Sequence, residues 1–263
     1  MKFLPVILAL YLCLFIGQSY AQMGYNDEIK QSAIQFVNTL DPAQKKLALL
    51  PFEDSARIRW NNLPVGLRPR AGINIGKMTE DQRKLFHRIL SVSLSSQGYL
   101  KATSILHLDN LLNMYYDSLY YKKAIDDTMH KFMQDLQWSH RNFYLAIFGN
   151  PGDKIWGYKV EGHHLSINFS FVDDKLSVTP FFIGTDPAEY PNTEYAGFRV
   201  LGQEEDLGIK LMALLSPALH LKATISKEVP GDIFTSAESG KRLLDFQGIK
   251  GSEMSKEQKA MAL

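Results

Sequence analysis

The residue types best suited to chemistry gather in the segment from Trp156 to Phe169. Two adjacent histidines, His163 and His164, follow the carboxylate of Glu161 there. Neutral imidazole binds zinc, copper, iron or nickel, and a nearby carboxylate adds a ligand or fixes a histidine tautomer. In a hydrolytic site the metal would lower the pKa of bound water, and Glu161 would accept its proton. We therefore take Glu161, His163 and His164 as candidate catalytic and metal-ligating residues for hydrolysis or oxidation.

The predicted strand around these histidines restricts that metal site. Side chains alternate along a strand, so His163 is expected beside Glu161 on one face and His164 beside Ser166 on the other. Both rings could ligate one ion only if Gly162 marks a bulge that re-aims a side chain. Otherwise, His163 is a core histidine hydrogen-bonded to Glu161, and His164 lies on a solvated face. The sequence leaves both interpretations open.

A second candidate site is a ligand pocket built from aromatic and amide side chains. An indole and amides precede Leu63-Pro64 in an irregular segment, as is common in pockets for carbohydrates or small molecules. A packed loop around a buried tryptophan is the alternative. The second functional hypothesis is thus a non-catalytic exported binding module for a small molecule or carbohydrate, with these ligand contacts: Trp60, Asn61, Trp156, Ser166 and Asn168.

The composition excludes several classes of site and partner. The only cysteine, Cys13, lies in the predicted signal sequence, so the mature chain lacks disulfides and thiolate ligands. Removing Lys2 with that signal leaves 28 basic residues (29 minus 1) against 28 acidic ones. A formal charge of zero predicts no nucleic-acid partner. Phosphate-binding glycine loops, nucleophile elbows and the His-Glu-x-x-His motif are also missing from the sequence.

The first 21 residues have the features of a secretory signal. A basic start at Lys2 precedes an apolar run over residues 4–16, and Ser19-Tyr20-Ala21 fits a cleavage site. The apolar run is shorter than the roughly 18 residues that a membrane-spanning helix requires. We expect an exported protein, periplasmic or extracellular after cleavage near Ala21, without stable membrane insertion.

The elements expected to position the candidate sites begin with helices. Apolar spacing predicts helix over residues 27–50, with Asp41-Pro42 starting a second helical turn. A capping box from Thr79 to Gln82 starts a helix whose apolar stripe ends near Gly98. Another helix is predicted over about residues 101–116, packed on the previous one as a hairpin, with residues 117–135 continuing as helix.

Strand patterns follow at hairpin spacing over residues 143–148, 156–161, 165–172 and 176–183, with Asp173-Asp174 as a turn. Helical patterns return over residues 204–215 and 255–263, the acidic residues 203–206 marking a helix start. This order predicts an α+β fold in which N-terminal helices pack on an antiparallel sheet meander and further helices follow. We expect a single α+β domain over residues 22–263.

A set of short motifs is collinear over about residues 50–250: Trp60 with Leu63-Pro64, Arg70 to Ile73, Gln82-Arg83, Leu94 to Tyr99, Phe148 to Pro151, Trp156-Gly157, Glu161 to Ser166 and Thr179 to Gly184. With them, the chain resembles the bacterial exported family catalogued as domain of unknown function 3500, which brings no established activity. The resemblance implies a longer protein with a strand-rich C-terminal part that carries a His-x-His element. It thus implies that this chain is truncated and that the paired histidines are half of a site.

Overall fold

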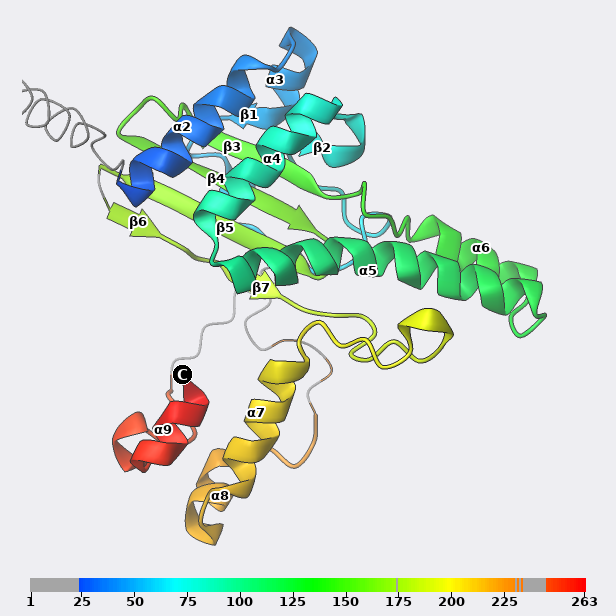
Figure 1. Ribbon diagram of the computed structural model, residues 1–263, viewed down its shortest axis with the longest axis vertical. Helices are drawn as coiled ribbons and strands as arrows, with labels where there is room; N and C mark the ends of the chain where they lie inside the picture. Colours follow the sequence, from blue (N-terminus) through cyan, green and yellow to red (C-terminus); the bar gives the residue numbers. More distant parts are fainter. Residues whose placement is uncertain (1–23, 174, 230, 232, 234–244) are drawn as a thin grey trace, which may run out of the picture.

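The computed structural model describes residues 24–173, 175–229, 231, 233 and 245–263. The predicted signal sequence and the second residue of the predicted Asp173-Asp174 turn lie outside these residues. A sheet with helices packed on one face makes up the larger part of the molecule, and a second group of helices follows it (Figure 1). The predicted α+β class is confirmed.

The sheet has seven strands within the described residues, in the order β1-β3-β4-β5-β6, with β2 beside β3 and β7 beside β5. The three long central strands form the predicted antiparallel meander, whereas β1 adds to β3 in parallel. The strands are β1 (Leu49–Leu50), β2 (Ile73–Asn74), β3 (Tyr144–Gly149), β4 (Ile155–Gly162), β5 (Leu165–Val172), β6 (Lys175–Ser177) and β7 (Phe181–Ile183).

Most helices begin where local sequence signals predict. Asp41 and Thr79 form capping boxes at the starts of α3 and α4, and α7 begins at the expected acidic stretch. The α-helices are α2 (Tyr25–Asn38), α3 (Pro42–Ala48), α4 (Glu80–Ser93), α5 (Ser96–Tyr121), α6 (Asp127–Asp135), α7 (Gly202–Ala213), α8 (Pro217–Ala223) and α9 (Lys256–Ala262). The 3-10 helices are η1 (Ser55–Arg57), η2 (Ile75–Lys77), η3 (Thr193–Tyr195) and η5 (Gly251–Glu253).

Several predicted boundaries are wrong. The helix predicted to end near Gly98 ends at Ser93, because Ser95 caps a new helix whose first turn contains Gly98. Residues 117–135 are two helices, since Asp126 caps α6 after a turn. Leu49 and Leu50, predicted as helix, pair with β3. The run 176–183 splits into β6 and β7 around Pro180, which has no amide hydrogen for the ladder.

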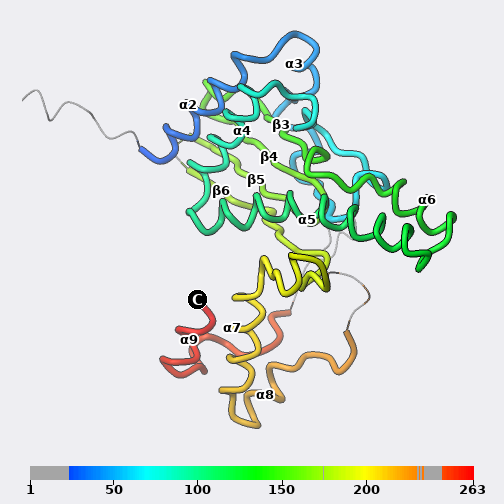
Figure 2. Tube along the Cα trace, turned by 45° about the vertical axis from the view of Figure 1, so that its right-hand side comes forward, coloured from blue at the N-terminus to red at the C-terminus, as the bar shows by residue number. Residues whose placement is uncertain are grey.

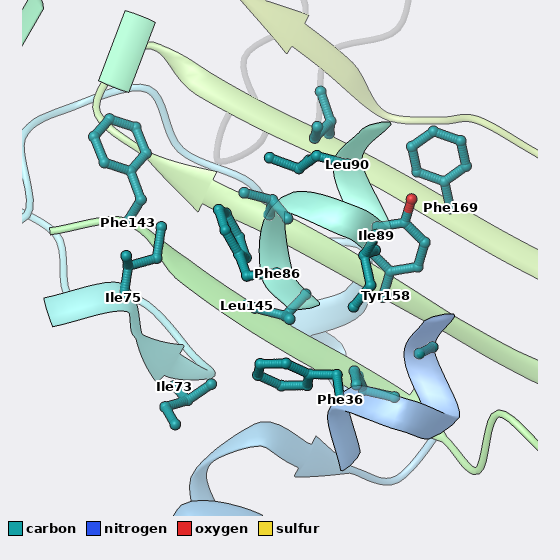
Figure 3. Close-up of a cluster of buried hydrophobic side chains, with 14 of the residues drawn as sticks. Phe36, Ile73, Ile75, Phe86, Ile89, Leu90, Phe143, Leu145, Tyr158 and Phe169 are labelled. Atoms are coloured by element: carbon teal, nitrogen blue, oxygen red, sulfur yellow. The ribbon is translucent and has the colours of Figure 1, made fainter. Parts of the chain in front are cut away.

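The main core lies between one face of the sheet and the helices α2 and α4, which cross it side by side (Figures 1 and 2). Phe36 of α2 and Phe86 of α4 point toward the sheet residues Leu145 and Tyr158 (Figure 3). All four side chains are at most 1% exposed. In β4, residues of this core such as Tyr158 alternate with polar residues that point to the other face of the sheet.

Along β4 and β5, the opposite face of the sheet is polar, yet it too is buried. Lys159 and Glu161 of β4 and Ser166 and Asn168 of β5 are all at most 3% exposed. The segment of residues 55–71, which includes η1, covers this face, since its backbone bonds to the side chains of Lys159 and Glu161. Buried polar groups require such partners, so this covering segment and the strands form one unit.

The helices α7, α8 and α9 lie beside the sheet part rather than on it (Figures 1 and 2). Gln258 of α9 donates to the carbonyl oxygen of Leu214 after α7 at 2.8 Å, and Lys222 pairs with Glu253 at 2.6 Å. The prediction of one domain over residues 22–263 stays a prediction.

Within the described part of the chain, none of the helices is both long and apolar enough to span a membrane.

Candidate functional site

Glu161 is the centre of a buried charged cluster. Its Oε2 atom lies 2.8 Å from Nζ of Lys159 and 3.6 Å from Nε of Arg70. Its Oε1 atom accepts a hydrogen bond of 2.7 Å from the backbone amide of Asn61. The three charged side chains are 2–4% exposed, so their attraction is weakly screened. The carboxylate therefore has two cations and a backbone donor as partners.

Lys159 ties the covering segment to the sheet. Its ammonium donates to the carbonyl oxygens of Ala56 and Arg59, each at 2.7 Å, as well as to Glu161. These acceptors match the three hydrogens of an ammonium group. Burial lowers the pKa of Lys159, and the charge of Glu161 opposes that shift. Lys159 is therefore a positioning residue whose hydrogen bonds are already made.

A pocket of about 300 Å³ lies between the covering segment and β4. Trp60 is half-buried in its wall and stacks on Phe182, with ring centroids 5.0 Å apart. The lining contains four cationic side chains and one carboxylate, so the pocket has a surplus of positive charge. The lining residues are Ser55, Ala56, Arg59, Trp60, Asn61, Arg68, Pro69, Arg70, Ala71, Lys159 and Glu161.

Arg70 fixes the shape of the covering segment from within. Its Nη2 atom donates to the carbonyl oxygens of Asn61 at 2.9 Å and Leu63 at 2.6 Å. The same atom lies 3.3 Å from the carbonyl oxygen of Gly162 at the end of β4. A guanidinium group suits this role because its donors point in several fixed directions. The segment that carries Trp60 is thereby held over the sheet.

Ser166 and Asn168 extend the polar face beyond Glu161. The Ser166 hydroxyl donates to Glu161 at 3.4 Å, and the Asn168 amide donates to the carbonyl oxygen of Pro180 at 2.7 Å. Asn168 Oδ1 is buried and has no hydrogen-bond partner among the described residues. The expectation that Glu161 and Ser166 lie on opposite faces is wrong, because the chain reverses between them and makes them cross-strand partners.

The chain reverses at the histidines themselves. Gly162 pairs with Leu165, so His163 and His164 are the two central residues of a tight hairpin turn. The predicted strand alternation is therefore wrong for both histidines, and no bulge at Gly162 is needed to bring them together. His164 has a positive φ of 55°, and the two rings stack with centroids 4.1 Å apart.

His163 belongs to a buried pair with Asp109 of α5. Its Nδ1 atom lies 2.7 Å from Asp109 Oδ1, and both residues are 4% exposed. Burial lowers the pKa of His163 to about 4 and raises the pKa of Asp109, with Asp186 raising both. Burial also lowers the pKa of His164 to about 4. When the proton of the neutral imidazole is on Nδ1, that atom donates to Asp109 and Nε2 is left as an acceptor.

The structure does not bring the three predicted metal ligands together as one donor set. Glu161 is bound by Lys159 and Asn61 on the polar face, whereas His163 turns to Asp109. Over the residues described, no group of three His, Cys, Asp or Glu side chains is arranged to hold a metal ion. As placed, Glu161, His163 and His164 do not fit a shared ion, and the metal site stays a prediction.

The predicted ligand contacts divide in a similar way. Trp60 and Asn61 line the pocket with Glu161, and Ser166 touches that carboxylate. Trp156, however, is buried in the core and stacks on Phe171 at 4.5 Å. It alternates with Lys159 and Glu161 along β4 and therefore lies on the other face of the sheet.

Three residues of these clusters were missed as site residues: Lys159, Arg70 and Asp109. Arg70 and Asp109 have their charged partners far away in the sequence, 54 residues in the case of Asp109 and His163, and the backbone acceptors of Lys159 are 100 or more residues away. A lysine two residues before a glutamate on a predicted strand was the one local signal, because it places both on the same face.

A family comparison covers nearly all of the chain. Residues 24–263 match the family model described as "Protein of unknown function (DUF3500)". Neither the curated proteins nor the solved structures gave a match. The match includes the covering segment, the charged cluster and the histidine turn, and it agrees with the resemblance carried by the short motifs. The chain belongs to the DUF3500 family, whose function is unknown.

Proposed function

We propose that this protein is an exported, non-catalytic binding module for a small organic anion. The ligand occupies the pocket between residues 55–71 and β4. One observation carries the proposal: a half-buried tryptophan shares a pocket of about 300 Å³ with four cationic side chains and one carboxylate. Pockets of this kind combine an apolar wall with a few placed polar groups.

The charge of the pocket favours an anion. Glu161 offsets one of the four positive charges and is itself held by Lys159 and Arg70. The surplus extends to the rim, where Arg59 and Arg68 are exposed. Arginine binds carboxylates and phosphate esters through paired hydrogen bonds. The ring of Trp60 offers a flat surface to the organic part of the ligand.

The buried cluster supports binding rather than catalysis. A general base or a nucleophilic amine must reach the substrate with a group that can exchange a proton. The hydrogen bonds of Lys159 are made to Ala56, Arg59 and Glu161, and Glu161 is held by Lys159 and Asn61. Both groups therefore serve to hold the floor of the pocket in place.

Export is part of the proposal. It is supported by the sequence features of residues 1–21. Mass spectrometry of the protein recovered outside the cytoplasm should give a chain that begins at Gln22.

Ligand binding can be tested with matched acids and amides. A thermal-shift screen of small carboxylates and phosphate esters at constant ionic strength should identify a stabilising acid, because a ligand of the folded state raises the unfolding temperature. Calorimetry with that acid should then give a dissociation constant about tenfold or more higher for Arg59→Gln and Trp60→Leu. Lys154→Gln, at an exposed lysine elsewhere on the surface, is the matched control.

The chemistry of the ligand decides the outcome. We expect the neutral amide of the best acid to bind much more weakly than the acid itself. Equal affinity for acid and amide, or full affinity in Arg59→Gln and Trp60→Leu, would overturn the proposal. Failure of every acid in the screen to stabilise the wild-type protein would also count against it.

A further inference from the structure

A second pocket of about 300 Å³ lies away from the first, between η2, the start of α4 and the loop that leads into β3. It shares no lining residue with the pocket over Glu161. Its lining combines two residues of η2 with three residues whose side chains carry or can accept a positive charge. The lining residues are Ile75, Gly76, Arg83, His140 and Arg141.

The cationic side chains of this pocket have no acidic partner in the described part of the chain. Arg83 donates from Nη1 to the carbonyl oxygen of Met78 at 2.5 Å, which uses one of its five N–H groups. Neither Arg83 nor Arg141 forms an ion pair with an aspartate or glutamate described here. By contrast, Arg70, Arg88 and Arg199 each face a carboxylate.

His140 adds an unsatisfied polar atom to this cluster. Its Nδ1 atom is buried and has no hydrogen-bond partner among the described residues. Its backbone amide is held by Asn110 Oδ1 at 2.9 Å, and its ring stacks on that of His107 at 6.0 Å. A buried polar atom without a partner is costly and calls for water or a ligand.

The ionisable groups that shift the pKa of His140 are all cationic when they are charged. Burial lowers the pKa of His140, and His107, Arg141 and Arg83 lower it further. Burial also lowers the pKa of His87 on α4, and His107 lowers it further. All charges named as acting on His140 thus have the same sign, which is the field that a bound anion would relieve.

We propose that this pocket binds a tetrahedral oxyanion, as inorganic phosphate or sulfate or as the phosphate group of a small monoester. Arg83 and Arg141 supply charged donors from two different elements. His140 supplies a further ring nitrogen. Arginine forks match the oxygen spacing of such anions, and their attraction is strong in a half-enclosed site. The site is separate from the proposed organic-anion pocket, and its failure would leave that proposal untouched.

Calorimetry with inorganic phosphate, at constant ionic strength set by chloride, tests the site. We expect saturable binding, with the dissociation constant raised about tenfold or more in both Arg83→Gln and Arg141→Gln. Arg141 is exposed, so its replacement tests the site even if Arg83→Gln fails to fold. Lys154→Gln, at an exposed lysine outside both pockets, should bind phosphate as the wild type does.

Two further arms identify the ligand source and the histidine. Methyl phosphate binding as tightly as phosphate would indicate a monoester site, and exclusion of methyl phosphate would indicate the free anion. Phosphate should also shift the ring resonances of His140 in NMR spectra, which His140→Asn assigns by their loss. Phosphate binding no tighter than chloride, or affinity unchanged in both arginine variants, would overturn the proposal. A loss of phosphate affinity in Lys154→Gln equal to that in Arg83→Gln and Arg141→Gln would also overturn the proposal, because Lys154 lies outside both pockets.

Discussion

At the scale of single residues, the buried cluster under residues 55–71 joins function to stability. Lys159, Arg70 and Glu161 are almost completely buried, and each charge depends on the others for compensation. Such clusters add little net stability compared with an apolar replacement, but removing one member leaves the remaining charges unpaired. The cluster is therefore sensitive to single substitutions, even though it does not explain why the fold is stable.

We predict that Glu161→Ala lowers the free energy of unfolding by about 3 kcal/mol, because two buried cations lose their carboxylate. Urea denaturation monitored by circular dichroism measures this change. The matched control is Asp135→Ala, which removes an exposed partner of Lys131 and should cost less than about 0.5 kcal/mol. Similar losses in both variants would show that the cluster at Glu161 is not electrostatically coupled.

Candidate site residues could be identified from the sequence where the neighbouring residues indicated them. Glu161, Ser166 and Asn168 were named as candidates from the sequence, and the structure places all three on the polar face, although Glu161 had been predicted on the face opposite the other two. Trp60 and Asn61, also named from the sequence, line the pocket beside that face. The sheet faces predicted for the two histidines were wrong, because the sequence around them did not distinguish a hairpin turn from a continuous strand. Asp109, the partner of His163, lies on α5, whereas His163 lies in the turn between β4 and β5, and no spacing rule connects the two.

At the scale of elements, close approach of two backbones fixes the entry to β2. Gly72 has a φ of 108°, and a Cβ atom there would lie 2.5 Å from the carbonyl oxygen of Leu145. Side chains other than glycine rarely adopt this φ, and the neighbouring atom belongs to the central strand β3. The loop that carries Arg70 is thus attached to the sheet at a position where only glycine fits.

We predict that Gly72→Ala lowers the free energy of unfolding by about 2 kcal/mol or more. Gly208→Ala is the matched control, because its Cβ would meet nothing within 4 Å inside α7. That change should raise helix stability by about 0.5–1 kcal/mol. Thermal unfolding of the two variants measures both effects. A loss of unfolding free energy in Gly72→Ala no larger than that typical of substitutions at exposed positions would contradict the steric argument.

The elements themselves were predictable to the extent that their signals are local. Asp41-Pro42 indicated the start of α3, and the capping box at Thr79 indicated the start of α4. Strand patterns at hairpin spacing indicated the central strands. The short strands β1 and β2 were missed because they exist only through pairing with β3, about 70 to 100 residues away in the sequence. Local composition does not reveal such long-range pairing, so Leu49 and Leu50 were predicted to continue the preceding helix.

At the scale of the whole molecule, the helices α7 to α9 form a part of their own beside the sheet (Figure 1). Val200 packs against the core just before α7. Lys101 of α5 also forms an ion pair with Glu204 in the first turn of α7. Because Lys101 is 22% exposed and Glu204 47%, this pair should bias the docking of α7 without deciding the stability of the sheet part.

We therefore predict that Lys101→Glu speeds hydrogen exchange in α7 by up to about fivefold while exchange in β3 to β5 stays unchanged. The reversed pair, Lys101→Glu with Glu204→Lys, should restore slow exchange in α7, because it recreates the attraction with opposite signs. Lys131→Glu is the matched control, since Lys131 pairs within α6 at 3.2 Å. Faster exchange in both α7 and the central strands would mean that the two parts unfold together. Unchanged exchange in α7 would mean that the packing around Val200 holds the helices in place and that the ion pair adds nothing.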